Sequence, residues 1–218
     1  RLITLFPDNT NYYNNRGLFY QDQEKYDLAL ADFEFILKLD PTYAWAINNI
    51  ALIYNKQEKY DLAIIEYTKA IEVLVDDPLS YSNRGLSYRD NLEDYEKALE
   101  DFTSAIDLDK DNPERYDYRA DCYIAMEDYN SALVDLSKAI DLAPDEAKWY
   151  AYRSRIYKYI KDKEKQLNDI NTALDLDKEY AYGYRLRGDV YLKEKDYDNA
   201  IADYLQAINF DSLSNYPK

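Results

Sequence analysis

One spacing recurs along almost the whole chain. A small residue returns at intervals of 34, 34, 35, 34 and 34 residues, and a tyrosine follows each one three residues later. A fixed period of this length indicates a repeat protein, in which each unit buries its apolar faces against its neighbours. The small residues are Gly17, Ala51, Gly85, Ala120, Ser154 and Gly188, and the tyrosines are Tyr20, Tyr54, Tyr88, Tyr123, Tyr157 and Tyr191.

Each repeat carries two apolar stripes with helical spacing. In the first repeat, Tyr13, Gly17 and Tyr20 share one helix face, and Ala29 and Phe33 share another. The pattern predicts a pair of helices that approach most closely at the small residues. The third repeat has one extra residue within 89–97, which predicts a longer turn between its two helices.

This pattern resembles the tetratricopeptide repeat family, whose 34-residue unit is a helix, a turn and a second helix. The resemblance implies an all-α fold, a right-handed α-solenoid (superhelix) of stacked units. It covers nearly the whole chain, and the ends are expected to be cut from a longer array. The expected divisions are the end of a preceding repeat at 1–9, six repeats at 10–43, 44–77, 78–112, 113–146, 147–180 and 181–214, and a tail at 215–218.

Composition disfavours several classes of function. The net charge of −16 repels phosphate backbones, which argues against nucleic acid as a partner. The absence of histidine and the single cysteine leave no triad, no thiolate cluster and no metal site. No apolar run has the length of a membrane span. The sequence therefore predicts a non-enzymatic protein with no cofactor and no membrane span, and it leaves localisation open.

Charged residues also follow the repeat. An arginine precedes the small residue in five of the six repeats, and an acid precedes the aromatic or apolar position of every second helix. We expect an Arg–Asp ladder that joins helices within or between repeats, against the alternative of solvated surface charge. The arginines are Arg16, Arg84, Arg119, Arg153 and Arg187, and the acids are Asp32, Glu66, Asp101, Asp135, Asp169 and Asp203.

Most of the 26 tyrosines keep the repeat register. They recur at two positions of the first helix, at the start of the second helix and at the Phe33 position, so they are predicted to be core residues. Cys122 stands in a slot that other repeats fill with Ile53 or Val190, and it is predicted to be a small buried residue.

The resemblance implies that the first helices line a concave groove. Asparagine repeats there in one register, although it is a poor mid-helix residue because its side chain competes for backbone hydrogen bonds. A carboxamide both donates and accepts, so a row of them suits the backbone of an extended peptide. The alternative is that an Asn-rich composition places them there. The candidate residues are Asn14, Asn15, Trp45, Asn48, Asn49 and Asn83.

From the fourth repeat onward, this face changes from asparagine to tyrosine and basic residues. Tyrosines flanked by Arg and Lys suit an anchored aromatic side chain, or an acidic or C-terminal segment of a partner. An ordinary amphipathic surface is the equal alternative. The candidate residues are Tyr118, Tyr152, Arg155, Tyr159, Tyr182 and Arg185.

The fifth repeat departs from the others. Gln166 replaces the second small residue, Lys163 replaces a tyrosine, and the segment from Lys161 to Lys165 is densely charged. A bulkier residue at a close helix contact predicts locally loosened packing.

Together these features favour a protein–protein interaction scaffold that binds an extended peptide or protein segment in its groove. Two alternatives stay open. The chain could be a structural module that forms a homo-oligomer through exposed solenoid ends, or the docking part of a larger protein.

Overall fold

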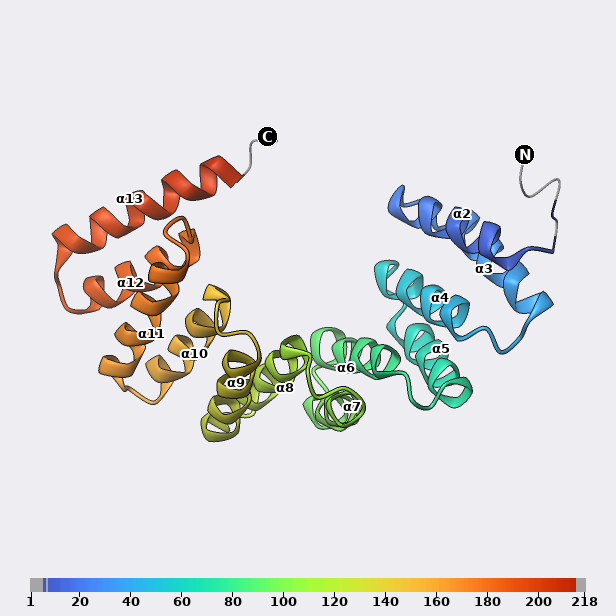
Figure 1. The fold of residues 1–218 in the computed structure, drawn as a ribbon, viewed down its shortest axis with the longest axis horizontal. Helices are drawn as coiled ribbons and strands as arrows, with labels where there is room; N and C mark the ends of the chain where they lie inside the picture. The colour runs from blue at the N-terminus through green and yellow to red at the C-terminus, as the bar shows by residue number, and fades with distance from the viewer. Residues whose placement is uncertain (1–5, 7, 215–218) are drawn as a thin grey trace. The chain divides into compact units, whose positions relative to one another are not determined.

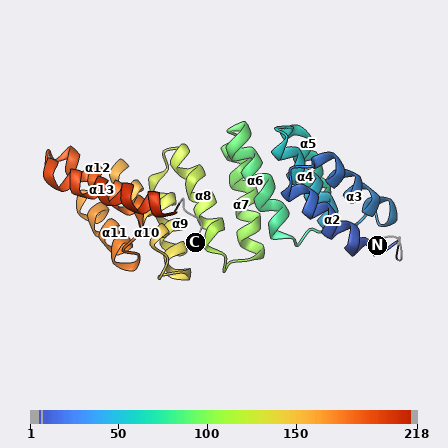
Figure 2. The ribbon, with the colours of Figure 1, turned by 90° about the horizontal axis from the view of Figure 1, so that it is seen from above.

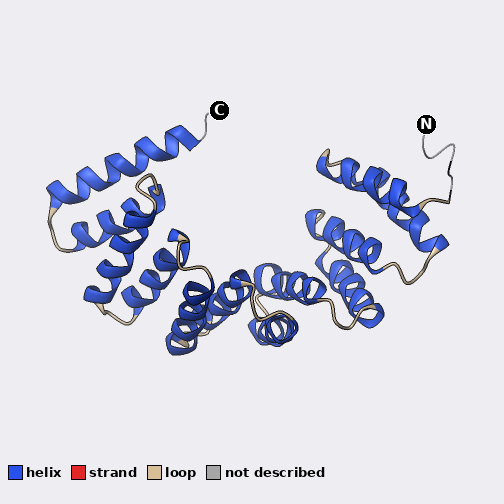
Figure 3. Cartoon of the chain, in the orientation of Figure 1, coloured by secondary structure: helices blue, strands red, loops and turns tan. Residues whose placement is uncertain are grey.

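The structure is a computed structural model that describes residue 6 and residues 8–214, with side chains described up to residue 211. Throughout this part the regular elements are twelve helices, and no strand occurs among them (Figure 3). The fold is thus an all-α solenoid of helix-turn-helix repeats, which confirms the predicted class. The predicted tail at 215–218 and most of the predicted segment 1–9 lie outside the described residues.

The chain divides into two compact units, Arg1–Lys110 and Asp111–Lys218. Within each unit the helices form pairs that are joined by short turns, and the second helix of a pair packs on the first helix of the next (Figures 1 and 2). The pairs of the first unit are α2 (Thr10–Asp22) with α3 (Tyr26–Leu39), α4 (Ala44–Lys56) with α5 (Tyr60–Val73), and α6 (Pro78–Leu92) with α7 (Tyr95–Leu108).

The second unit repeats this arrangement. Its first helix begins at a proline that Asn112 precedes, and the Asn112 side chain accepts a hydrogen bond from the backbone N–H of Glu114 at 3.0 Å. Such a cap satisfies one of the unpaired N–H groups of the first turn. The pairs are α8 (Pro113–Ala125) with α9 (Tyr129–Leu142), α10 (Ala147–Tyr159) with α11 (Lys163–Leu176), and α12 (Ala181–Lys193) with α13 (Tyr197–Ser214).

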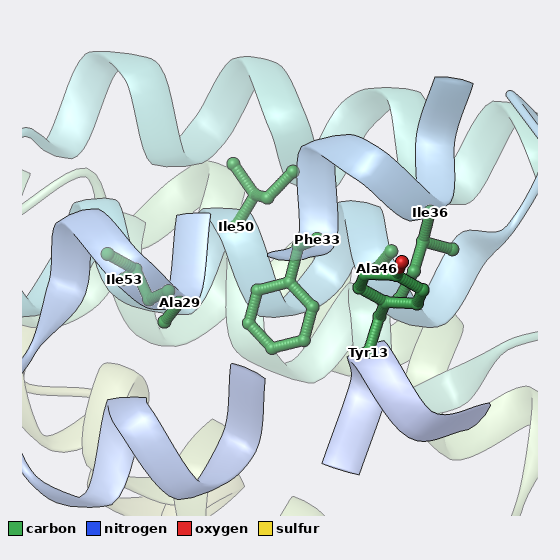
Figure 4. Close-up of a cluster of buried hydrophobic side chains, with 7 residues drawn as sticks. All are labelled: Tyr13, Ala29, Phe33, Ile36, Ala46, Ile50 and Ile53. Atoms are coloured by element: carbon green, nitrogen blue, oxygen red, sulfur yellow. The ribbon is translucent and has the colours of Figure 1, made fainter. Parts of the chain in front are cut away.

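The small residues lie where the two helices of a pair meet. A Cβ added at Gly17 would come within 2.8 Å of the Phe33 ring, and one at Gly85 would meet Phe102 at the same distance. Phe33 is fully buried, and its ring lies among side chains of α2, α3 and α4 (Figure 4). The predicted close contact between the paired helices is therefore confirmed.

The turn inside each pair has a residue in the left-handed conformation. Glu24, at φ 57°, is typical, and the backbone N–H of the next residue, Lys25, bonds to the carbonyl of Tyr20 at 2.9 Å. This closes the first helix as in a Schellman motif, but with glutamate where glycine is usual. The other left-handed residues are Glu58, Glu93, Glu127, Lys161 and Lys195.

The expected longer turn of the third repeat is wrong. The extra residue extends the helix, because α6 has 15 residues while α2 has 13. Only Glu93 and Asp94 separate α6 from α7. The Asp94 N–H donates to the Tyr88 carbonyl at 3.0 Å. The extra residue thus lies in the last turn of α6, before the left-handed Glu93.

The Arg–Asp ladder is confirmed. Arg84 Nε and Nη2 donate to the two oxygens of Asp101 at 2.9 and 2.7 Å, and Arg84 Nη1 donates to Thr68 of the preceding repeat at 2.9 Å. The same two-pronged ion pair joins Arg153 to Asp169, whose side chain is only 2% exposed. The remaining pairs are Arg16–Asp32, Arg119–Asp135 and Arg187–Asp203.

The prediction that the register tyrosines form the core is wrong for most of them. Tyr13, Tyr67 and Tyr116 are buried, but Tyr197 is 57% exposed and the others are half-buried. Many instead flank the ladder arginines. The Arg153 guanidinium lies 5.9 Å from the ring centres of both Tyr150 and Tyr157. A tyrosine in this position covers the charge with its ring, and the Tyr150 hydroxyl donates to the Pro144 carbonyl at 3.2 Å.

The second repeat lacks the arginine and one of its two flanking tyrosines. Ile47 and Ile50 replace the tyrosine and the arginine, and both are buried. Glu66 bonds instead to Lys69 at 2.6 Å, one turn along its own helix. Cys122 is fully buried, as predicted.

Replacing Glu24, Glu58 and Glu127 together by glycine should raise stability. An L-residue in the left-handed region costs roughly 1–2 kcal/mol, and glycine's greater freedom in the unfolded chain offsets part of the gain. We expect about 0.5–1 kcal/mol per site, measured as a higher urea midpoint. Glu34→Gly in the exposed middle of α3 is the matched control and should lower stability by about 1 kcal/mol; a lower midpoint for the triple variant would contradict this account.

Arg153→Met should be strongly destabilising. It leaves the buried Asp169 carboxylate without its cation, a change that typically costs about 3–5 kcal/mol. Arg153→Met with Asp169→Leu should recover most of the loss, because two apolar side chains need no partner. Thermal denaturation measures both. Lys165→Met breaks the exposed pair with Asp162 and should leave the midpoint unchanged; an equal loss in that control would contradict a special role for the buried pair.

Candidate functional site

The predicted groove asparagines all belong to the first unit, but they differ in burial. Asn15 is exposed, Asn83 is half-buried, and Asn48 and Asn49 are 5% and 9% exposed. Asn83 Nδ2 donates to Asn48 Oδ1 at 3.4 Å, so these two carboxamides join α6 to α4. Part of the predicted row therefore bonds within the protein.

A second carboxamide link joins the same helices. Asn55 Nδ2 donates to Ser87 Oγ at 2.7 Å and to the Tyr67 hydroxyl at 3.4 Å. Burial raises the pKa of Tyr67 above its ordinary value, so its hydroxyl stays protonated. These bonds position the amide of Asn55 while leaving its oxygen unused.

Three buried acceptor oxygens of the first unit have no hydrogen-bond partner among the described residues: Asn14 Oδ1, Gln21 Oε1 and Asn55 Oδ1. Asn14 and Gln21 are two turns apart on α2, and Asn55 is 34 residues after Gln21. A buried acceptor without a donor costs about 1–3 kcal/mol. Each oxygen therefore keeps an unused acceptor site below the protein surface.

Trp45 presents a large apolar surface in the same unit. Its side chain is 61% exposed, and it borders a shallow hollow beside Asn48, Leu74 and Leu79. An exposed tryptophan next to a hollow is a typical contact residue in protein interfaces.

The second unit holds an open pocket lined by tyrosines. The Tyr182 ring lies 6.4 Å from Tyr152 and 6.0 Å from Tyr180, centre to centre, and both pairs meet edge to face. The pocket has a volume of about 440 Å³ and is also lined by Arg155, Asp117 and Asp121. Its walls thus combine ring faces with charged groups, which is the usual make-up of a recognition pocket.

Burial affects the ionisation of two of the pocket's tyrosines. It raises the pKa of Tyr180 above its ordinary value. Burial, and then the negative charge of Asp117, raise the pKa of Tyr152. Near neutral pH, the phenols of Tyr152 and Tyr180 therefore offer hydroxyl donors and neutral rings.

A buried tryptophan, Trp149, packs against Tyr152 in the wall of the pocket. Trp149 is 1% exposed, and its ring lies 5.9 Å from Tyr152 with an interplanar angle of 75°. The Lys148 ammonium lies 4.2 Å from the Trp149 ring and pairs with Glu114 at 3.2 Å. The contact with the buried Trp149 ring therefore holds the Tyr152 ring in place.

The structure brings together only some of the residues predicted for this face. Tyr152, Arg155 and Tyr182 line one pocket, and the Arg185 guanidinium lies 4.8 Å from the Tyr182 ring. Tyr118 does not line it, and Tyr159 instead stacks on Tyr129 at 5.2 Å.

Sequence reasoning missed Tyr180. It precedes α12 and was assigned to no helix face, yet it contributes a wall of the pocket. The signal was present, because Tyr43 precedes α4 in the same register and packs on the core of the first unit.

Neither membrane insertion nor metal binding is indicated in the part of the chain that the structure describes. No helix there has the length and apolar character needed to cross a membrane. Nor do its acidic and cysteine side chains form a group of three that could hold a metal ion.

Comparisons with known proteins agree on one family. Models described as tetratricopeptide repeat match residues 8–76, 92–156 and 182–212. The chain therefore belongs to the tetratricopeptide repeat family, which typically provides non-catalytic scaffolds for protein–protein interaction. None of the curated proteins matches the sequence.

Solved structures share the fold at low sequence identity. PilF of Pseudomonas aeruginosa is 19% identical with a TM-score of 0.76, over 90% of this chain and 89% of its own. YrrB, described as a TPR protein with an unusual peptide-binding site, is 20% identical with a TM-score of 0.65, over 84% and 93%. MamA of Desulfovibrio magneticus RS-1 is 19% identical with a TM-score of 0.67, over 79% and 97%.

The two tryptophans should report on different surfaces. In a Trp45→Phe variant, Trp149 alone should emit at short wavelength and resist acrylamide quenching, because its ring is buried. In a Trp149→Phe variant, Trp45 should emit at longer wavelength and be quenched readily. Fluorescence quenching of both variants measures this difference, and equal quenching would contradict the burial described above.

Proposed function

We propose that this protein is a scaffold that binds an extended peptide or protein segment, and that the tyrosine pocket of the second unit anchors one side chain of that segment. The pocket itself carries the proposal, since three tyrosine rings and three charged groups surround an open volume of about 440 Å³. A pocket of this kind takes one side chain of the partner, and that side chain supplies most of the binding energy.

The charge of the pocket favours a basic anchor. Two carboxylates, those of Asp117 and Asp121, and one guanidinium, that of Arg155, are among the residues that line it. Tyrosine faces attract a Lys or Arg side chain, and nearby carboxylates strengthen that attraction. We therefore favour a basic side chain over the acidic or C-terminal segment that the sequence alone suggests.

The first unit supports binding of a peptide backbone. The unpartnered oxygens of Asn14, Gln21 and Asn55 are buried, so they would accept a peptide N–H after their side chains rotate outward. Each bond contributes only about 0.5–1.5 kcal/mol net, so selectivity would come from the anchor pocket. Asn15, Asn49 and Asn83 remain candidate contacts on α2, α4 and α6.

Selection of a random peptide library on the whole chain tests the proposal. We expect enriched peptides to share a Lys or Arg, and to bind Tyr182→Ala at least tenfold more weakly because the anchor loses its ring contact. Tyr197→Ala removes an exposed tyrosine outside the pocket and should bind like the wild type. Fluorescence polarisation measures the affinities.

Self-association is the second candidate, and one observation favours it. Ile201, Leu205 and Ile208 form a stripe on α13 that is 57–65% exposed. Leu174, in the register of Ile208, is buried in the preceding repeat. If selection yields no peptide that distinguishes Tyr182→Ala from the wild type, and light scattering shows concentration-dependent assembly, self-association becomes the better account.

A further inference from the structure

The fifth repeat departs from its neighbours at three positions that converge on one place. Lys161 takes the left-handed position that is glutamate in the first four repeats. Lys163 begins α11 where tyrosine begins the other second helices, and Gln166 replaces the alanine of the other five repeats. All three side chains line a pocket of about 100 Å³ between the turn after α10 and the end of α12.

Lysine dominates the walls of this pocket. Lys158 and Lys193 join Lys161 and Lys163, while Asp189 and Glu194 are its acidic residues. The lining therefore carries a net positive charge in a chain whose net charge is −16.

Both acids of the pocket are already engaged. Glu194 pairs with Lys163 at 3.0 Å, and Asp189 accepts a hydrogen bond from the Tyr204 hydroxyl at 2.9 Å. Among the described residues, no carboxylate lies within ion-pair distance of Lys158, Lys161 or Lys193. Three ammonium groups thus remain available to an anion.

Gln166 gives the pocket a polar floor. The residue is 8% exposed, and no side-chain hydrogen bond of its carboxamide occurs among the described residues. Its polar atoms are not among the buried unpartnered ones, so the carboxamide opens onto the pocket that it lines. The packing around it is otherwise regular: α10 and α11 have 13 and 14 residues, like α8 and α9, and Arg153–Asp169 is intact.

We propose that this pocket binds a phosphate group. A dianionic oxyanion presents several acceptor oxygens, which suit three ammonium groups and the N–H of one carboxamide. A volume of about 100 Å³ is several times the roughly 10–15 Å³ that a single water needs, so one oxyanion group can enter. Charge-assisted hydrogen bonds of this kind are about twice as strong as neutral ones. The site is separate from the tyrosine pocket, and the proposal does not depend on the proposed function.

Titration with inorganic phosphate at constant ionic strength tests the site, with phosphorus NMR as the measurement. Wild type should bind phosphate, and Lys161→Glu should bind at least tenfold more weakly because it places a carboxylate at the pocket. Gln166→Ala should bind severalfold more weakly. Lys195→Glu is the matched control, since it makes the same charge change at a left-handed residue outside the pocket, and it should bind like the wild type.

Two further arms define the ligand. O-phosphoserine should compete with inorganic phosphate if the site takes a phosphate monoester, and failure to compete would restrict it to the free ion. Acetate at the same concentration should compete poorly. The proposal is overturned if wild type does not bind phosphate, if Lys161→Glu and Lys195→Glu bind equally, or if acetate competes as well as phosphate does.

Discussion

The buried ion pair between paired helices is the constraint on which the rest of the structure depends. A carboxylate as enclosed as that of Asp169, 2% exposed, is tolerated only when a cation and hydrogen bonds replace its water. Arg153 supplies both, and its third nitrogen donates to Ser137 of the preceding repeat at 3.2 Å. One side chain thus fixes the distance within a pair and the stacking onto the previous pair. This explains why a polar feature recurs at a fixed register in a fold held mainly by apolar burial.

The second repeat shows what happens where this constraint is absent. With Ile47 and Ile50 in place of tyrosine and arginine, the two helices pack around the buried Tyr67, whose hydroxyl accepts a hydrogen bond from Asn55. Replacement of a buried pair by apolar side chains is often neutral for stability. Two polar links to the next repeat are made by carboxamides, those of Asn48 and Asn55, while Thr68 accepts a hydrogen bond from Arg84. The buried part of the asparagine row, Asn48 and Asn49, thus lies in the repeat that lacks the ion pair.

The period alone predicted the helix pairs, the close contacts at Gly17 and Gly85, and the two residue series that form the ion pairs, because each follows from spacing on a helix face. It left open whether the ion pairs form within or between repeats. Features that depend on three-dimensional packing could not be predicted in this way. The extra residue of the third repeat lengthened α6, since the left-handed Glu93 kept its place next to α7. The register predicted which helix face carries each tyrosine, but it did not predict how deeply the side chain is buried. Many of these rings cover arginines near the protein surface. Tyr180 was missed because it lies before its helix, where helical spacing assigns no face.

The contrast between the two pockets of the second unit suggests how a repeat scaffold acquires sites. Both lie beside α10 and α12, yet one is lined by tyrosines and carboxylates and the other by lysines. The fifth repeat keeps Arg153 and Asp169, which set its geometry, and changes residues such as Lys161 that face the turn. Because the ion pair joins the two helices, Gln166 replaces the usual alanine while α10 and α11 keep their lengths and the Arg153–Asp169 pair. Local chemistry can therefore vary widely from repeat to repeat as long as the residues that join the helices are kept.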